Sequence, residues 1–170
     1  MSKKIEAWRS ANLFEIGIGY VIVSRHKAGG EFEAGVFLLD VYCLGVKDAF
    51  FREFPAGQLD SLHEKMFGVV GKVALTPACA RKLIEDAVAY ANRLGLPPHE
   101  DHKQACRVLG GIVAAECGEA FTFGEPKSGK PLYVQGPNDT PAFVQRVMNT
   151  LQRDRGTGNF DFVIETPSPD

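Results

Sequence analysis

The stretch LPPHEDHKQAC, from Leu96 to Cys106, gathers two histidines, two carboxylates and a cysteine within eight residues. On a helix, His99, His102 and Cys106 would lie close enough in direction for their side chains to converge. Imidazole and thiolate groups are both good ligands of Zn²⁺. Zinc sites usually pair their ligands within a short knuckle and repeat that pair elsewhere, and this sequence has no second pair. We therefore expect no bound zinc, and we assign no cofactor.

Two hypotheses for the same stretch need no metal. Glu100 and Asp101 would favour the positive end of a helix that begins near His99. Cys106 and His102 have the residue types of a thiol nucleophile and its base. Both would sit on one short helix without a third group to orient the base. The polar start of a helix is the interpretation we prefer.

Asp40 lies within FLLDVYCLG, an apolar stretch that predicts a strand with both faces covered. A buried carboxylate is costly unless it is paired or hydrogen-bonded. Lys47 follows within a turn or two, and Arg25 lies on the preceding predicted strand. One hypothesis is therefore a structural ion pair between Asp40 and Lys47 or Arg25.

The second hypothesis for the same region is catalytic. Two carboxylates and a lysine resemble the equipment of metal-dependent phosphodiester cleavage, in which Mg²⁺ binds carboxylate oxygens. The candidate catalytic residues are Asp40, Lys47 and Asp48, with His99 and Asp101 brought in by folding. Their spacing matches no nuclease motif.

A further polar stretch, GPNDTP at 136–141, runs into a predicted helix. The free amide groups at a helix start can hold an anion. Asp139 and Thr140 are expected to occupy those amides as caps, and Asp139 would repel an anion. We therefore expect a capped helix and no anion site.

The elements that must position these residues follow from apolar periodicity and turn residues. In chain order we predict strands at 15–26 and 32–45 forming a hairpin, a short helix or turn at 46–54, an ambiguous segment at 58–75, helices at 76–94 and from about residue 99, a second hairpin over 120–136, a helix at 138–153 and a strand at 159–165. This order predicts a single α+β domain, with a largely antiparallel sheet of about five strands and three main helices packed on it. We expect it to span 14–165, after a loosely ordered lead-in (1–13) and before a disordered tail (166–170).

Composition narrows the class of protein. The 170 residues carry 19 basic and 21 acidic side chains, a net charge of −2, which gives no support to nucleic-acid binding. We expect no membrane span, because no apolar run is long enough. The four cysteines show no paired spacing, and no secretion signal is apparent, so we expect reduced thiols and a cytoplasmic location.

Three stretches carry a resemblance: FLLDVYCLGVKDAFF, LGLPPHEDH and FTFGEPKSGKPLYVQGPND. Together they resemble a bacterial protein family to which no activity is attached. The resemblance covers roughly Gly17 to Glu165 and implies one domain. The family has an aromatic residue at the position of His102, which argues against a metal-binding role there. It implies no substrate, cofactor or catalytic residue.

The function that best fits these observations is a small cytosolic binding or regulatory domain that contacts another protein. The alternative is the metal-dependent hydrolase, possibly a nuclease, that uses Asp40, Lys47 and Asp48. The two hypotheses differ in one expectation: the hydrolase requires the candidate residues to meet in one cleft.

Overall fold

The structure, a computed structural model, describes residues 4–165. The predicted tail at 166–170 and the first three residues of the predicted lead-in lie outside the described residues. The centre of the fold is one five-stranded antiparallel sheet with the strand order β4-β3-β2-β1-β5. Its strands are β1 (Ile5–Ser10), β2 (Ile18–His26), β3 (Phe32–Asp40), β4 (Gly45–Phe54) and β5 (Lys72–Leu75).

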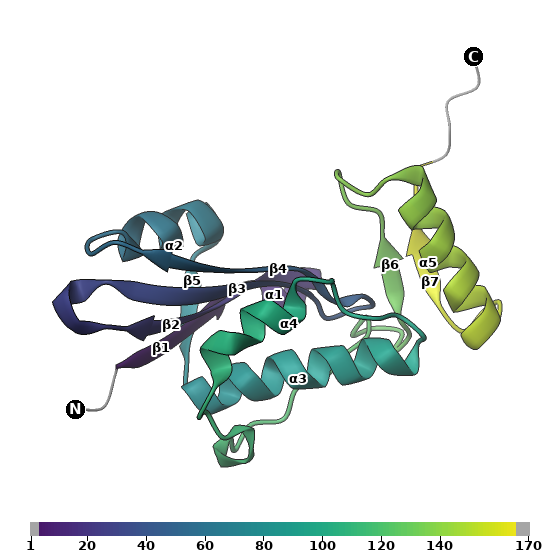
Figure 1. Cartoon of the computed structure of the whole chain (residues 1–170). Coiled ribbons are helices and arrows are strands. Elements are labelled where there is room, and N and C mark those ends of the chain that lie inside the picture. Colours follow the sequence, from purple (N-terminus) through teal and green to yellow (C-terminus); the bar gives the residue numbers. More distant parts are fainter. Residues whose placement is uncertain (1–3, 166–170) are drawn as a thin grey trace.

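Helices lie on both faces of this sheet and at one end of it (Figure 1). They are α1 (Leu13–Ile16), α2 (Leu59–Phe67), α3 (Pro77–Arg93), α4 (His102–Ala105) and α5 (Pro141–Asp154), with the short turns η1 (Ala28–Gly30), η2 (Gly68–Val70), η3 (Cys106–Leu109) and η4 (Ala114–Glu116). Two short strands, β6 (Leu132–Val134) and β7 (Asp161–Val163), form a separate parallel pair. The α+β prediction with a five-stranded antiparallel sheet is confirmed. No helix of the described residues is both long enough and apolar enough to cross a membrane.

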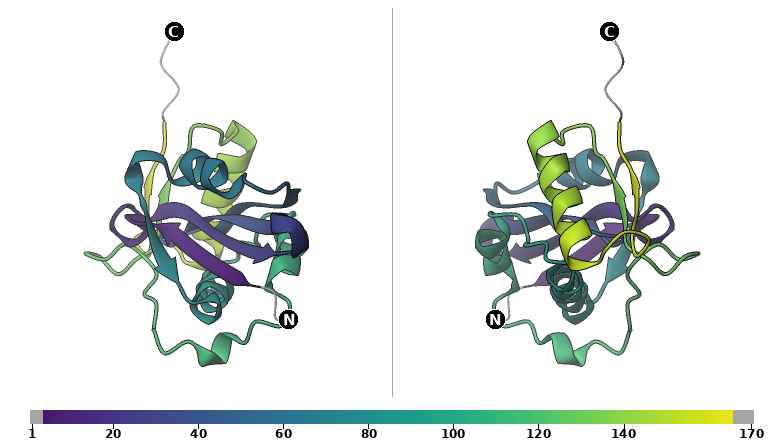
Figure 2. Two further views of the ribbon diagram at one scale, coloured as in Figure 1. Left: turned by 90° about the vertical axis from the view of Figure 1, so that its left-hand side faces the viewer. Right: turned by 90° about the vertical axis from the view of Figure 1, so that its right-hand side faces the viewer.

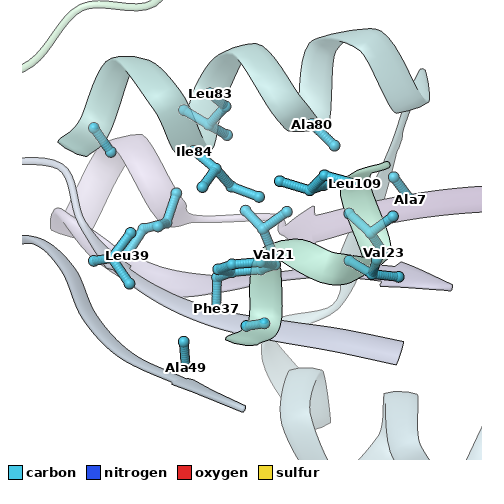
Figure 3. Close-up of a cluster of buried hydrophobic side chains, with 14 of the residues drawn as sticks. Ala7, Val21, Val23, Phe37, Leu39, Ala49, Ala80, Leu83, Ile84 and Leu109 are labelled. Atoms are coloured by element: carbon cyan, nitrogen blue, oxygen red, sulfur yellow. The ribbon is translucent and has the colours of Figure 1, made fainter. Parts of the chain in front are cut away.

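The face of the sheet that carries α3 holds the largest core. Side chains alternate along each strand, so Val21 and Val23 of β2 and Phe37 and Leu39 of β3 point to the same face. They pack against Leu83 and Ile84 of α3, among others (Figure 3). α4 and η3 cover the same face beside α3, where Gly35 has no side chain: a Cβ there would lie only 2.5 Å from Val108. Gly35 thus permits the close approach of these turns.

The opposite face carries α2. Ile22, Val36 and Phe32 of the sheet pack there against Leu62 and Phe67 of the helix. A third cluster joins β6, α5 and the two residues that flank β7, Phe160 and Ile164, to the end of the sheet. It includes Cys43 and Leu44 of the β3–β4 turn and the last turn of α3. We call β6, α5 and β7 the C-terminal layer.

Two stretches of the main sheet correct the sequence-based expectation. Residues 46–54 form most of β4 rather than a helix or turn, because Ala49 and Phe51 face the α3 core while Phe50 and Phe54 face α2. Residues 5–10, part of the predicted lead-in, form β1, which is paired on both sides. The sequence of β1 is short and partly polar, so it gives little local signal for a strand. Pairing with β2 and β5 stabilises the strand instead.

The structure of the region 99–136 also differs from the sequence-based prediction. The helix expected from about residue 99 is only the short α4 continued by η3. The second hairpin does not form, since β6 pairs in parallel with β7, far along the chain. The helix predicted at 76–94 is confirmed as α3, whose cap Thr76 accepts the N–H of Cys79 at 3.1 Å.

The cysteines also correct an expectation. Cys79 and Cys117 form a disulfide, while Cys43 and Cys106 are free thiols. The segment around η4 lies on the outer side of α3, away from the sheet, which brings Cys117 back to the first turn of α3 (Figure 2). The two cysteines are 38 residues apart, so no local spacing indicates the pair.

Candidate functional site

A cleft of about 880 Å³ lies on the α2 face of the sheet, beyond the end of α2. The strands β2, β3 and β4 supply its floor with Tyr20, Leu38 and Asp48. One wall is the end of α2 with η2. The other is the loop 135–140 with the first turns of α5. The cleft therefore lies where the C-terminal layer meets the sheet, a position common for binding sites.

Apolar side chains around this cleft are unusually exposed. The cleft is lined by Ile16 at the end of α1, Ile18 at the start of β2, Val70 of η2 and Val134 of β6. Their exposed fractions are 55%, 36%, 43% and 48%, respectively. We call these four residues the apolar rim. Grouped exposed hydrophobic side chains mark interaction sites more often than single ones do.

The predicted catalytic residues come largely to this cleft. Asp40, Lys47, Asp48 and His99 all line it. His99 Nε2 lies 3.6 Å from Asp48 Oδ1, and its Nδ1 accepts the N–H of Asp101 at 3.1 Å. The backbone N–H of His99 donates to the carbonyl of Val46 at 2.9 Å, which fixes this segment against β4. Asp101 is thus attached to the group through His99 without lining the cleft.

Asp40 has a structural task at the bottom of this region. Its Oδ1 accepts the backbone N–H groups of Tyr42 and Cys43, each at 3.0 Å, within the turn that joins β3 to β4. Only 8% of the residue is exposed. Burial raises the pKa of Asp40 to about 6, against the lowering effect of the backbone N–H groups of Leu44, Tyr42 and Cys43. Asp40 therefore caps the turn.

The predicted ion pair of Asp40 is wrong. Arg25 donates instead to the carbonyls of Val108 and Gly110. Lys47 Nζ lies 3.1 Å from Asp139 Oδ1 and 3.2 Å from its Oδ2. Among residues 4–165, neither Lys47 nor Arg25 forms a salt bridge with Asp40. Each of these cations instead binds a segment that lies far along the sequence.

Lys47 and Asp139 form the main polar link across the cleft wall. Asp139 also accepts the Tyr133 hydroxyl and the Gly136 N–H, both at 2.8 Å. Burial alone would raise the pKa of Asp139, but the hydrogen bonds from Gly136, Tyr133 and Lys47 lower it below its usual range. The expected cap of α5 is partly confirmed: Thr140 accepts the N–H of Phe143 at 3.1 Å, whereas Asp139 binds elsewhere.

The geometry does not assemble a set of metal ligands. Within residues 4–165, no three His, Cys, Asp or Glu side chains come together in a way that could hold a metal ion. His102 Nε2 lies 3.2 Å from Cys106 Sγ, but Cys117 is bound to Cys79. Burial lowers the pKa of His102 and raises that of Cys106, so the pair is held as a neutral imidazole and a thiol.

Sequence reasoning missed the apolar rim entirely. Ile16, Ile18, Val70 and Val134 come from four separate elements, and each belongs to a stretch that looks like ordinary core. Only Val70 lies in a stretch, 58–75, that the sequence left ambiguous. Their exposure is decided by which neighbours fail to cover them.

Comparison with known proteins adds no assignment: no family model, no curated protein and no solved structure matches this chain. The resemblance carried by the stretches FLLDVYCLGVKDAFF, LGLPPHEDH and FTFGEPKSGKPLYVQGPND therefore stays a prediction from sequence.

Proposed function

We propose that this protein is a binding domain that holds an apolar segment of another protein in the cleft beside the C-terminal layer. The observation that carries the proposal is the apolar rim: Ile16, Ile18, Val70 and Val134 surround one concavity and remain accessible to solvent. Burying such side chains against a partner is favourable by about 25 cal/mol per Å² of apolar surface.

The polar groups of the cleft support an occupant with an apolar body and a polar edge. Asp48 and His99 stand at the β4 side, and Arg146 of α5 stands at the other. Charges of both signs around an apolar centre are typical of the rim of a protein interface. Their role in this proposal is to set the orientation of the bound segment.

This proposal is tested by selecting binding peptides from a random display library, with the purified chain as bait. We expect enriched peptides to share apolar anchor residues. Val70→Asp and Val134→Asp should each weaken their binding by at least about tenfold, since a charge would be buried where an apolar contact was lost. Titration calorimetry with one synthetic peptide measures the change.

Val113→Asp is the matched control, because Val113 is 51% exposed and does not line the cleft. It should bind the peptide as the parent does. Peptides whose affinity is unchanged by both cleft substitutions would refute the proposed site, as would a selection in which no peptide is enriched.

The metal-dependent hydrolase remains the second candidate, since Asp40, Lys47, Asp48 and His99 line the same cleft. It is the weaker one because no set of metal ligands assembles within residues 4–165, and because Asp40 is committed to the turn and Lys47 to Asp139. Incubation of the chain with a chromogenic phosphodiester and Mg²⁺ separates the two. Turnover that is lost in His99→Ala would favour the hydrolase, and we expect no turnover.

The cytoplasm is the location we propose, as the sequence suggested, and the Cys79–Cys117 disulfide is the observation that weighs against it. Disulfides persist in oxidising compartments and are rare in the cytoplasm. Thiol labelling of the chain in lysates quenched with acid decides the point. The chain must be unfolded for the labelling, because Cys43 is buried. Four reactive cysteines would then support the cytoplasm, and two would support an oxidising compartment.

A further inference from the structure

We propose that two copies of this chain associate through their β4 strands, antiparallel, with the two-fold axis at Phe50. The two sheets would then continue across the contact as one. This inference goes beyond the binding cleft and does not depend on what occupies it.

The edge of the sheet at β4 is long and open. β4 has ten residues and is paired only with β3. Among the described residues, the segment before α4 reaches this edge at Val46, whose carbonyl accepts the N–H of His99. The Ala49 N–H donates to the Asp48 carboxylate at 2.8 Å. An unpaired strand edge presents backbone donors and acceptors that can bind a second strand. The stretch 50–54 is thus open to pairing, and pairing at Ala49 requires its N–H to exchange Asp48 for the second strand.

The charges along β4 select one partner and one register. With Phe50 opposite Phe50 of the second copy, Asp48 lies opposite Arg52, and by symmetry this pair occurs twice. Both residues are exposed and lie on the α2 face of the strand. Opposite charges directly across an antiparallel pair are stabilising, and like charges there are destabilising.

Neighbouring registers lack this complementarity. Directly opposite residues must point to the same face of a sheet, so the neighbouring registers are centred on Ala49 and on Phe51. A shift to Ala49 sets Asp48 against Phe50. A shift to Phe51 sets Asp48 and Arg52 against aromatic rings instead of each other. The charges that would block indiscriminate pairing of this edge therefore permit the register centred on Phe50.

An apolar groove runs beside the same edge and would be covered by the contact. It has a volume of about 600 Å³ and lies between β4 and α2. Phe50 and Phe54 line it from the strand, and Leu62 and Met66 line it from the helix. With the two-fold axis perpendicular to the sheet, the two grooves adjoin and the Phe50 rings meet. Apolar burial thus supplies affinity, and the charge pairs supply the register.

The contact would also reach the candidate cleft. Asp48 lies 3.6 Å from His99 and lines that cleft. In the proposed register, Arg52 of the second copy comes next to Asp48. Each copy would thereby add a cation to the polar end of the other's cleft.

Sedimentation equilibrium of the full chain and of two charge-reversed variants tests the proposal. Asp48→Arg places two arginines opposite each other, and Arg52→Asp places two aspartates opposite each other. Each variant alone should self-associate at least about tenfold more weakly than the parent. An equimolar mixture of the two variants restores opposite charges at both positions, so the mixture should associate as tightly as the parent. Recovery in the mixture also shows that both variants are folded.

Asp161→Arg is the matched control, because Asp161 is an exposed carboxylate on β7, outside both β4 and its groove. Its self-association should equal that of the parent. The proposal is overturned if the parent chain is monomeric up to high micromolar concentration. It is equally overturned if the single variants associate like the parent, or if their mixture is no tighter than either variant alone.

Discussion

Asp40 shows how a single buried carboxylate can be structural without an ion pair. Its oxygen satisfies two backbone N–H groups of the β3–β4 turn, and its cationic neighbours are bound elsewhere. Burial is the largest cause of the raised pKa of Asp40, which is about 6. The folded state therefore binds a proton more tightly than the unfolded chain does. Stability from this group is full below the unfolded pKa, near 3.8, and is lost as the pH rises through about 6.

This linkage predicts the behaviour of Asp40→Asn. The amide keeps an oxygen that can accept a backbone N–H but carries no charge. At pH 8 we expect the variant to be as stable as the parent or more stable, by at most about 3 kcal/mol. The difference should shrink as the pH falls toward 4, where the parent's carboxyl is protonated. Urea unfolding of both proteins across this pH range measures it.

Asp40→Ala is the companion variant, because it removes the acceptor as well as the charge. It should be about 2 kcal/mol less stable than Asp40→Asn at every pH, because both variants lack the titrating carboxyl and differ only in the acceptor. An Asn variant that is much less stable than the parent at every pH would contradict the assignment of burial as the dominant effect at this position.

At the scale of elements, the Cys79–Cys117 disulfide anchors a segment that has little regular secondary structure. The segment from Gly110 to Pro131 contains only η4, and its backbone runs outside α3. Lys82 donates to the Glu119 carbonyl, and Phe123 stacks on Tyr90, so side chains fix the rest of the segment. A long loop without its own hydrogen-bond ladder gains most from a covalent closure.

We predict that Cys79→Ala/Cys117→Ala lowers the free energy of unfolding by about 4 kcal/mol, the entropy that a closed loop of this length removes from the unfolded chain. Guanidinium unfolding in non-reducing buffer measures the loss. Addition of a reductant should destabilise the parent but leave the double variant unchanged. Cys106→Ala serves as the control, since Cys106 is a free thiol. Equal stability of the parent and the double variant would exclude a structural role for the bond.

At the scale of the whole molecule, the C-terminal layer is attached to the sheet through an apolar cluster, an ion pair and a hydrogen bond from the Leu132 N–H to the Tyr42 carbonyl at 3.1 Å. Leu44, Ala91 and Leu94 of the main body contact this layer. Lys47 of β4 reaches Asp139, whose side chain is only 6% exposed. The apolar contacts hold the layer in place, and the ion pair fixes the wall of the candidate cleft.

Lys47→Met should therefore loosen the C-terminal layer selectively. Asp139 would keep its bonds from Tyr133 and Gly136 but lose the charge that offsets its burial. A loss of about 2 kcal/mol in local stability corresponds to amide exchange more than tenfold faster in α5, β6 and β7. Hydrogen exchange read by mass spectrometry measures it, and the amides of β2 and β3 serve as the internal reference. Uniform acceleration across the sheet would contradict a local role.

The sequence by itself determined the elements whose signal is local. The apolar periodicity and the Thr-Pro start predicted α3 and α5, and the glycine turn between two β-branched runs predicted the β2–β3 hairpin. It also indicated Asp40, Lys47, Asp48 and His99, since polar groups next to buried strands require partners. These four residues do share one cleft.

Only the tertiary structure decided which partner each of those groups has. The bonds of Lys47 to Asp139 and of Cys79 to Cys117 join residues 92 and 38 positions apart. β1 is a strand because β2 and β5 flank it, and β4 is one because α2 and α3 cover its two faces. Long-range contacts of this kind leave no periodicity in the chain, because their free energy arises only when distant segments meet. The apolar rim has the same origin, since exposure depends on the neighbours that the completed fold supplies.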